Sequence, residues 1–202
     1  YYLLNGTKNW ITNGNSASVY LVMAQTDVAK GSQGINTFIV EKNWPGVTVG
    51  AKENKLGIRG SDTHSIMFTD VKVPKENRIG ADGFGFKFAM KTLAGGRIGI
   101  ASQALGIASG SYELSLKYAK ERKAFGKEIC NHQAIQFKLA DMATRIEAAR
   151  LLCLKAAWEK DNGLNYDLSS SMAKVFASET AMWVTVEAVQ IHGGYGFVKE
   201  YH

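Results

Sequence analysis

Short apolar runs that alternate with polar positions occupy the first 80 residues, and this pattern predicts β-strands. β-branched and aromatic residues dominate four of the runs, at residues 18–24, 35–40, 47–49 and 64–74. Asn5-Gly6 favours the positive backbone angles of a tight hairpin. Several short strands separated by turn residues predict an antiparallel sheet or barrel, and an incomplete one would leave an unpaired edge.

After about Gly83 the apolar spacing lengthens from two residues toward the 3.6 residues of an α-helical turn. This spacing predicts three helices, at residues 84–123, 131–160 and about 167–191. Asp161-Asn162-Gly163 is expected to end the second helix, and the serines after Asp167 can cap the third. Long helices with short connections belong in a bundle, so the expected fold class is α+β.

Composition narrows the classes of function. The net charge of +6 would suit an anionic partner, but the Lys and Arg residues are scattered singly, so nucleic acid is not expected. No apolar run approaches the ~20 residues that cross a bilayer, so no membrane partner is expected. Cys130, Cys153 and the four histidines lack metal-ligand spacing, which predicts no metal site and two buried thiols. Tyr1 begins what reads as the middle of a strand, so the natural N-terminus is expected upstream.

Glycines recur inside the first predicted helix, at Gly95, Gly96, Gly99, Gly106 and Gly110. Each costs roughly 1 kcal/mol relative to alanine, so several in one helix call for a reason. Close packing of another helix is the interpretation that physical reasoning alone favours. The alternative is a groove in which a thin ligand lies against the backbone, with Arg97 beside a phosphate or a carbonyl.

Three further stretches could contact a ligand, and each also has an ordinary structural explanation. The indole and hydroxyl of Trp10–Thr12 could cover a flat ring and bond its edge, although a core anchor is the commoner role for such an indole. Cations flank Phe125 in the run Arg122–Lys127, where a guanidinium could hold a diphosphate or sit near a helix C-terminus. Gln190 precedes Gly193-Gly194, whose backbone could approach a ligand or simply end a helix.

The order of these motifs resembles the acyl-CoA dehydrogenase family over essentially the whole chain. Three stretches are similar to the family's middle domain: residues 4–13 (LNGTKNWITN), 55–63 (KLGIRGSDT) and 68–74 (FTDVKVP). Four more follow in family order: Gly96-Arg97, residues 121–126 (ERKAFG), His132-Gln133 and residues 190–196 (QIHGGYG). Residues 92–108 look most like the short-chain, butyryl-CoA branch.

The resemblance implies a partial chain with two domains. Residues 1–80 would be the C-terminal part of the barrel-like middle β domain. Residues 81–202 would be the first three long helices of the C-terminal helical bundle. The family usually assembles as a homotetramer, so the same assembly is expected here.

The resemblance also implies FAD as the cofactor and an acyl-CoA as the substrate. Three residues would line the flavin ring: Trp10, Ile11 and Thr12. Three would reach the FAD of a neighbouring subunit: Arg122, Phe125 and Gln133. The FAD would also be approached by Gln190, Gly193 and Gly194. Gly96 and Arg97 would border the acyl-CoA, but Ala94 stands where many members have an aspartate, which puts one polar contact in doubt.

The family reaction converts a short-chain acyl-CoA to its trans-2-enoyl-CoA by removing two hydrogens. A glutamate takes the α proton, the β hydride passes to FAD, and an electron-transferring flavoprotein receives the electrons. The short-chain branch places this glutamate beyond His202, and another branch places it at the position of Gly96. No residue is therefore assigned as the catalytic base, and the 202-residue chain alone is expected to be inactive.

Two other interpretations remain open. A non-catalytic assembly or interaction module could keep the fold without the chemistry, and an oxidase-like relative could pass electrons to oxygen. The bacterial cytoplasm and the mitochondrial matrix both fit as compartments.

Overall fold

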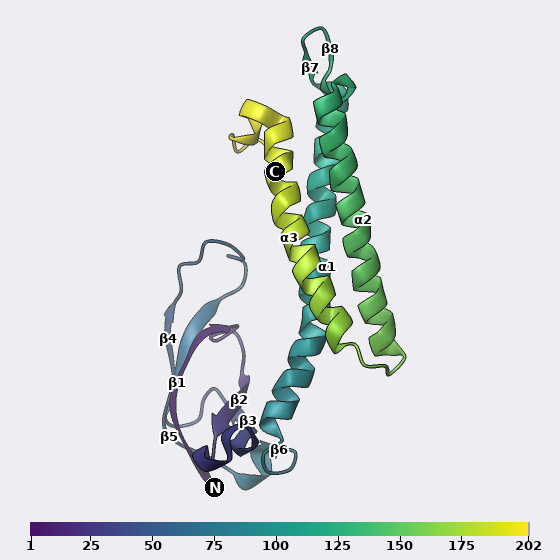
Figure 1. Ribbon diagram of the computed structural model, residues 1–202. Helices are drawn as coiled ribbons and strands as arrows, with labels where there is room; N and C mark the ends of the chain where they lie inside the picture. The colour runs from purple at the N-terminus through teal and green to yellow at the C-terminus, as the bar shows by residue number, and fades with distance from the viewer. Residues whose placement is uncertain (202) are drawn as a thin grey trace. The chain divides into compact units, whose positions relative to one another are not determined.

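The computed structural model describes residues 1–201, which divide into two compact units (Figure 1). The first unit, Tyr1–Met90, carries the longer β-strands, and the second, Lys91–His202, is mainly helical. Each unit has its own apolar core. The α+β class expected from the sequence is confirmed.

Two antiparallel three-stranded sheets make up most of the first unit. The first has the order β1-β5-β4, with β1 at Tyr2–Thr12, β5 at Thr63–Val73 and β4 at Val47–Lys52. The second has the order β2-β3-β6, with β2 at Val19–Gln25, β3 at Ile35–Glu41 and β6 at Arg78–Ile79. Because β1 and β2 each lie at the edge of a sheet, the strands of the described residues do not close into a barrel.

Side chains from both sheets meet in one core, as the alternation along the strands predicts. Its buried members are Leu4, Tyr20, Val22, Phe38, Val40, Ile66, Phe68, Val71 and Val73. A cavity of about 800 Å³ is lined by residues 2–8 of β1, by residues 22–25 of β2 and by Thr26, which follows β2. The two edge strands therefore border a partly open space within this unit.

The prediction of a hairpin at Asn5-Gly6 is wrong, because β1 runs straight through these residues. Its pairing with β5 shifts register between Leu4 and Gly6, and Gly6 has a φ of 137°. The Asn5 side chain donates to Asp70 Oδ1 at 3.0 Å and accepts from the Asp70 backbone N–H at 2.8 Å. The positive angle thus serves a β-bulge rather than a turn.

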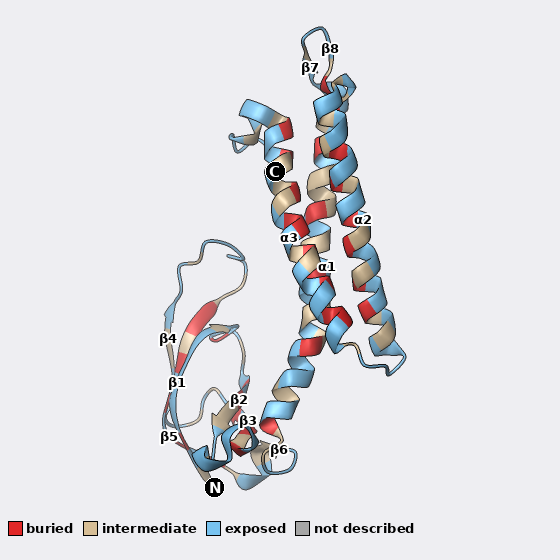
Figure 2. Ribbon diagram, viewed as in Figure 1, coloured by how far each residue is buried: buried red, intermediate tan, exposed pale blue. Residues whose placement is uncertain are grey.

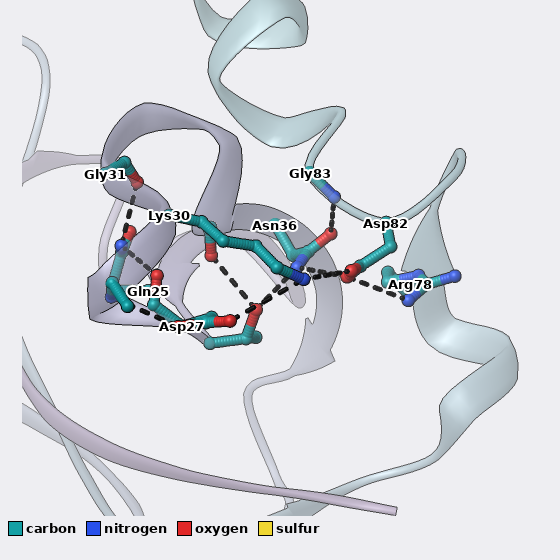
Figure 3. A network of polar contacts seen from close by, with 11 residues as sticks. Gln25, Asp27, Lys30, Gly31, Asn36, Arg78, Asp82 and Gly83 are labelled. Atoms are coloured by element: carbon teal, nitrogen blue, oxygen red, sulfur yellow. Dashed lines mark hydrogen bonds and ion pairs between the residues drawn. The ribbon is translucent and has the colours of Figure 1, made fainter.

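A fully buried asparagine organises the junction between the second sheet and the first helix (Figure 3). Asn36 donates to Thr26 Oγ1 at 2.7 Å and to Asp82 Oδ1 at 3.0 Å, and it accepts from the Gly83 N–H at 2.9 Å. The bond from Asn36 lowers the pKa of Asp82, with help from the nearby Lys30. These contacts hold the chain just before the helix against β3.

Three long helices form the bulk of the second unit: α1 at Gly85–Glu121, whose first turns belong to the first unit, α2 at Gln133–Asp161 and α3 at Asp167–His192. Their bounds match the predicted ranges to within two residues. Buried positions follow one face of each helix (Figure 2) and form two apolar clusters to which all three helices contribute. Cys153 is buried as predicted, whereas Cys130 is only half-buried.

The end of α2 agrees with the sequence-based prediction, and the start of α3 does not. Gly163 follows α2 with a φ of 69°, as a helix stop requires. The start of α3 is not capped by the serines; instead Asn165 Oδ1 accepts from the Asp167 N–H at 3.0 Å. Ser171 lies inside the helix, where its hydroxyl donates back to the Asp167 carbonyl at 2.7 Å.

Close helix packing does not explain the glycines of α1 within the described chain. A Cβ placed on Gly96, Gly99, Gly106 or Gly110 would meet no atom within 4 Å. At Gly95 it would meet only the end of the Lys160 side chain, at 3.8 Å. The favoured interpretation from the sequence is therefore not borne out here, and α1 presents a stretch of bare backbone.

Asn36 and its neighbour Thr37 provide a matched test of this core. Both are fully buried, but Thr37 Oγ1 has no hydrogen-bond partner among residues 1–201. Asn36→Ala should lower the free energy of unfolding by about 2 kcal/mol or more, because it removes three hydrogen bonds made by a fully buried side chain. Thr37→Val should raise it by about 1 kcal/mol, because an unpaired hydroxyl is replaced by a methyl group. Urea denaturation measures both, and similar losses in the two variants would contradict this account.

Candidate functional site

Trp10–Thr12, the first candidate segment, closes β1. The pairing with β5 shifts register between Lys8 and Ile11, and Trp10 has a φ of 55°. A bulky residue in this left-handed region is strained by roughly 1–3 kcal/mol. The Trp10 side chain is 74% exposed, whereas Ile11 packs against the sheet core. The alternative that Trp10 anchors the core is therefore wrong, and its ring is available to a ligand.

The turn that follows this segment is held by Asp62, which sequence reasoning missed. The Asp62 carboxylate accepts from the Asn15 N–H at 2.9 Å, from the Ser16 N–H at 3.3 Å and from the Ser16 hydroxyl. Its backbone carbonyl accepts from the Asn13 N–H at 3.0 Å. The bond from the Ser16 hydroxyl, followed by that from the Asn15 amide, lowers the pKa of Asp62 to about 2. Asp62 is thus a carboxylate at neutral pH.

A short hairpin projects beyond the end of α1 in the second unit. Its strands are β7 at Lys123–Ala124 and β8 at Lys127–Glu128, and they replace the helix end predicted there. The two turn residues, Phe125 and Gly126, have φ values of 52° and 82°. Two-residue hairpins require such angles, but phenylalanine is a strained choice at the first position. The Phe125 side chain is nevertheless 96% exposed.

Arg122 and the glycine pair after α3 meet around one cavity. A space of about 440 Å³ is lined by residues that include Arg122, Gly193 and Gly194. Gly193 has a φ of 59° and ends α3, and a Cβ on either glycine would meet nothing within 4 Å. The guanidinium of Arg122 forms no hydrogen bond or ion pair within residues 1–201. A forked cation and open backbone together suit an anionic, phosphate-bearing ligand.

Four aromatic residues around Arg122 were not predicted from the sequence: Tyr118, His192, Tyr195 and Tyr201. Tyr118 stacks on His192 with a centroid distance of 4.4 Å, and the Arg122 guanidinium lies 5.3 Å from the Tyr195 ring centre. Burial raises the pKa of Tyr118, and the charge of Arg122 partly opposes this rise. His192 and Tyr195 flank the glycine pair, and that proximity in sequence was the available signal.

The two glutamines of the predicted set are exposed at the same end of the helical unit. Gln133 is the first residue of α2, just after His132, whose Nε2 donates to the Ala124 carbonyl at 3.1 Å. Gln190 lies in the last turn of α3. Figure 1 shows the β7–β8 hairpin and the C-terminal end of α3 toward this end of the unit. The structure therefore brings together, at one end of the helical unit, the elements that carry the predicted residues Arg122, Phe125, Gln133, Gln190, Gly193 and Gly194.

Gly96 and Arg97 lie elsewhere on α1. Arg97 lies on α1 and Arg122 just after its last residue, 25 positions later, which corresponds to roughly 37 Å along the helix axis. Gly96 is exposed and Arg97 is half-buried, whereas Ala94 is 3% exposed. These two residues form a separate candidate contact on the bare stretch of α1.

Other classes of site receive no support from the described residues. Within residues 1–201, no group of three or more His, Cys, Asp or Glu side chains could hold a metal ion. None of the described helices is both long and apolar enough to cross a membrane.

Two family models account for most of the chain. The model described as "Acyl-CoA dehydrogenase, middle domain" matches residues 1–71, and "Acyl-CoA dehydrogenase, C-terminal domain" matches residues 83–202. The chain therefore belongs to the acyl-CoA dehydrogenase family.

Individual relatives agree with this placement. A short-chain specific acyl-CoA dehydrogenase of Megasphaera elsdenii is 54% identical over 99% of this chain and 52% of its own length. The caffeyl-CoA reductase–Etf complex subunit CarC of Acetobacterium woodii is 51% identical over 100% of this chain and 53% of its own length. A mitochondrial short-chain specific acyl-CoA dehydrogenase of Mus musculus is 52% identical over 98% of this chain and 48% of its own length. The chain spans about half the length of these relatives.

Solved structures show the same fold. Butyryl-CoA dehydrogenase from Megasphaera elsdenii has a TM-score of 0.96 at 53% identity, covering 100% of this chain and 52% of that one. PigA, solved with FAD and proline, has a TM-score of 0.95 at 32% identity, and the match covers 98% of this chain and 52% of PigA. The resemblance to the butyryl-CoA branch is thus confirmed at the level of sequence and fold.

The strained turn residue Phe125 allows a test of whether the hairpin is built for stability. Phe125→Asn should raise the free energy of unfolding by about 1 kcal/mol, because Asn-Gly is the favoured pair in such a turn. The matched control is Phe137→Asn on α2, where the side chain is 60% exposed on a right-handed helix and a small loss is expected. Chemical denaturation measures both, and destabilisation by Phe125→Asn would show that Phe125 supports the fold.

Proposed function

We propose that this chain supplies FAD- and acyl-CoA-binding surfaces to a flavin-dependent acyl-CoA dehydrogenase. The reaction oxidises the α,β carbons of a short-chain acyl-CoA to the trans-2-enoyl-CoA. Support comes from the family membership and from the 54% identity to a short-chain specific enzyme. When bound, FAD would accept the hydride that leaves the β carbon.

The observation that carries this proposal is the cluster at one end of the helical unit. Arg122 offers up to five N–H donors in a planar fork, a geometry that suits a diphosphate. Gly193 and Gly194 leave backbone that no side chain covers, so a ligand can approach closely. Phe125 projects an apolar ring from a strained turn. A diphosphate joined to a flat aromatic base, as in FAD, matches this combination of groups.

The first unit offers its own groups for a flavin ring. Trp10 presents an exposed indole, and Thr12 presents an exposed hydroxyl two residues later. An indole face beside a flat heterocycle excludes water, and a hydroxyl can donate to the edge of that heterocycle. We assign Trp10, Ile11 and Thr12 to this contact. Arg122, Phe125 and Gln133 are assigned to the FAD of a neighbouring subunit, and Gln190, Gly193 and Gly194 to further FAD contacts.

The substrate contact is assigned to Gly96 and Arg97. Bare backbone at Gly96 and Gly99 leaves room for a thin chain against the helix, and Arg97 adds a positive charge beside it. Gly96 has no side chain that could take a proton. We therefore assign no catalytic base within these residues, and we expect the chain alone to bind FAD without turning over substrate.

Partners and compartment follow from the same relatives. CarC belongs to a complex named for its Etf, so an electron-transferring flavoprotein is the proposed electron acceptor. Large apolar side chains exposed along α2 and α3, among them Leu151, Trp158, Met182 and Val186, fit a homotetramer. The bacterial cytoplasm and the mitochondrial matrix are the proposed compartments.

A fluorescence titration of the 202-residue chain with FAD tests the proposal. Wild type should bind FAD, and Arg122→Lys should bind about tenfold more weakly, because an ammonium keeps the charge but loses the fork. Arg150→Lys is the matched control on α2, where Arg150 pairs with Glu147 at 3.2 Å, and it should bind like wild type.

Three outcomes would contradict the proposal. A wild-type chain that binds no FAD would favour the non-catalytic assembly module, and equal affinity in both variants would remove Arg122 from the site. Oxidation of butyryl-CoA by this chain at a rate typical of enzymes would show that a base lies within it.

A further inference from the structure

The turn at residues 13–16 is fixed from two sides. On one side Asp62 bonds three of its residues, as described above. On the other side the Tyr20 hydroxyl donates to the Gly14 carbonyl at 2.6 Å. A Cβ on Gly14 would come within 3.0 Å of His64 Cβ, so the turn also packs closely on β5.

His64, two residues after Asp62, forms a hydrogen bond with a second strand, β4. His64 Nδ1 lies 2.8 Å from the Gly50 carbonyl, which can only accept, so Nδ1 carries the proton. The other ring nitrogen, Nε2, lies 3.4 Å from Asp62 Oδ2. Both His64 and Thr63 are buried, and Thr63 pairs with Thr12. Asp62 directly precedes Thr63, the first residue of β5, so the strand pairing of its neighbour anchors it to the sheet.

Trp10 needs such support because packing does not provide it. Its side chain is 74% exposed and is not part of the apolar core, whereas its neighbour Ile11 packs against that core. Its left-handed backbone is strained, and strained residues persist only where the surrounding structure over-determines them. The restraints next to Trp10 are the strand pairing of Ile11 and Thr12 and the anchored turn at residues 13–16. The direction of the indole thus depends on hydrogen bonds rather than on burial.

We propose that Asp62 is a positioning residue for the flavin: it holds residues 13–16 and thereby fixes how Trp10 and Thr12 project from the end of β1. This inference rests on the proposed function, because it assumes that these two residues contact the cofactor. Asp62 acts through the turn and takes no part in proton or hydride transfer.

Fluorine NMR of the chain labelled with 5-fluorotryptophan tests the positioning without cofactor. The chain has four tryptophans, Trp10, Trp44, Trp158 and Trp183, and Trp10→Phe assigns the resonance of interest. In Asp62→Asn the Trp10 resonance should shift, because the amide has one accepting oxygen in place of two and its uncharged oxygen accepts weaker bonds from the turn. The Trp44 resonance should stay, because Trp44 packs against the core of the same unit and reports on its folding.

Two further variants sharpen this comparison. Ser16→Ala removes one donor to Asp62 and should move the Trp10 resonance in the same direction by a smaller amount. Glu53→Gln neutralises an exposed acid on the connection between β4 and β5, which also carries Asp62. The Glu53 side chain makes no hydrogen bond or ion pair within residues 1–201, so this variant should leave all four resonances unchanged.

The FAD titration supplies the second readout. Asp62→Asn should weaken FAD binding about tenfold, the equivalent of one charge-assisted hydrogen bond, while Glu53→Gln should bind like wild type. An unmoved Trp10 resonance, a Trp44 resonance that shifts alongside it, or an unchanged affinity for FAD would each overturn the inference. A wild-type chain that binds no FAD would sink the proposed function, and the Trp10 resonance would still decide whether Asp62 positions the indole.

Discussion

Backbone hydrogen bonds that hold two exposed aromatic residues in the left-handed region are the constraint on which the candidate site depends. Trp10 and Phe125 both have positive φ values, and both side chains project into solvent. Burial cannot supply the energy that keeps them there, because neither lies in an apolar core. Asp62 and the sheet fix the backbone at Trp10, and the β7–β8 pairing fixes the backbone at Phe125. Strain of this kind is typical of residues whose orientation matters more than their contribution to stability.

The group of residues around Arg122 in the helical unit depends on helix packing. Arg122 lies just after α1 and Gly193 just after α3, more than 70 positions later in the sequence. Apolar clusters shared by the three helices set the register at which these two ends meet. The stacking of Tyr118 on His192 then fixes the local geometry beside the glycines. A substitution in the apolar clusters of the bundle is therefore expected to change the positions of Arg122 and Gly193, although the substituted residue contacts neither of them.

The sequence predicted the regular elements well because periodicity depends on local spacing. The three helices lie within two residues of their expected ranges, and the predicted strand runs are all present. Local rules failed where a long-range partner decided the outcome. Asn5-Gly6 has the composition of a hairpin turn, but pairing with Asp70 on β5 makes it a bulge. The hairpin around Phe125 was missed because phenylalanine is a poor residue for its turn.

The same distinction applies to the candidate site. Motif order pointed to Trp10, Arg122 and Gly193, and the structure supplies the exposure and open backbone that a ligand requires there. Periodicity could not indicate Asp62, since its role depends on a turn almost fifty residues earlier in the chain. The roles of all these residues toward FAD stay predictions.

Hydrogen–deuterium exchange of the chain with and without FAD tests the central claim most directly. The account predicts that FAD slows exchange of the backbone amides in two separate stretches, residues 10–16 and residues 122–126, together with those of Gly193 and Gly194. Protection confined to other parts of the chain, with these amides unchanged at saturating FAD, would contradict it.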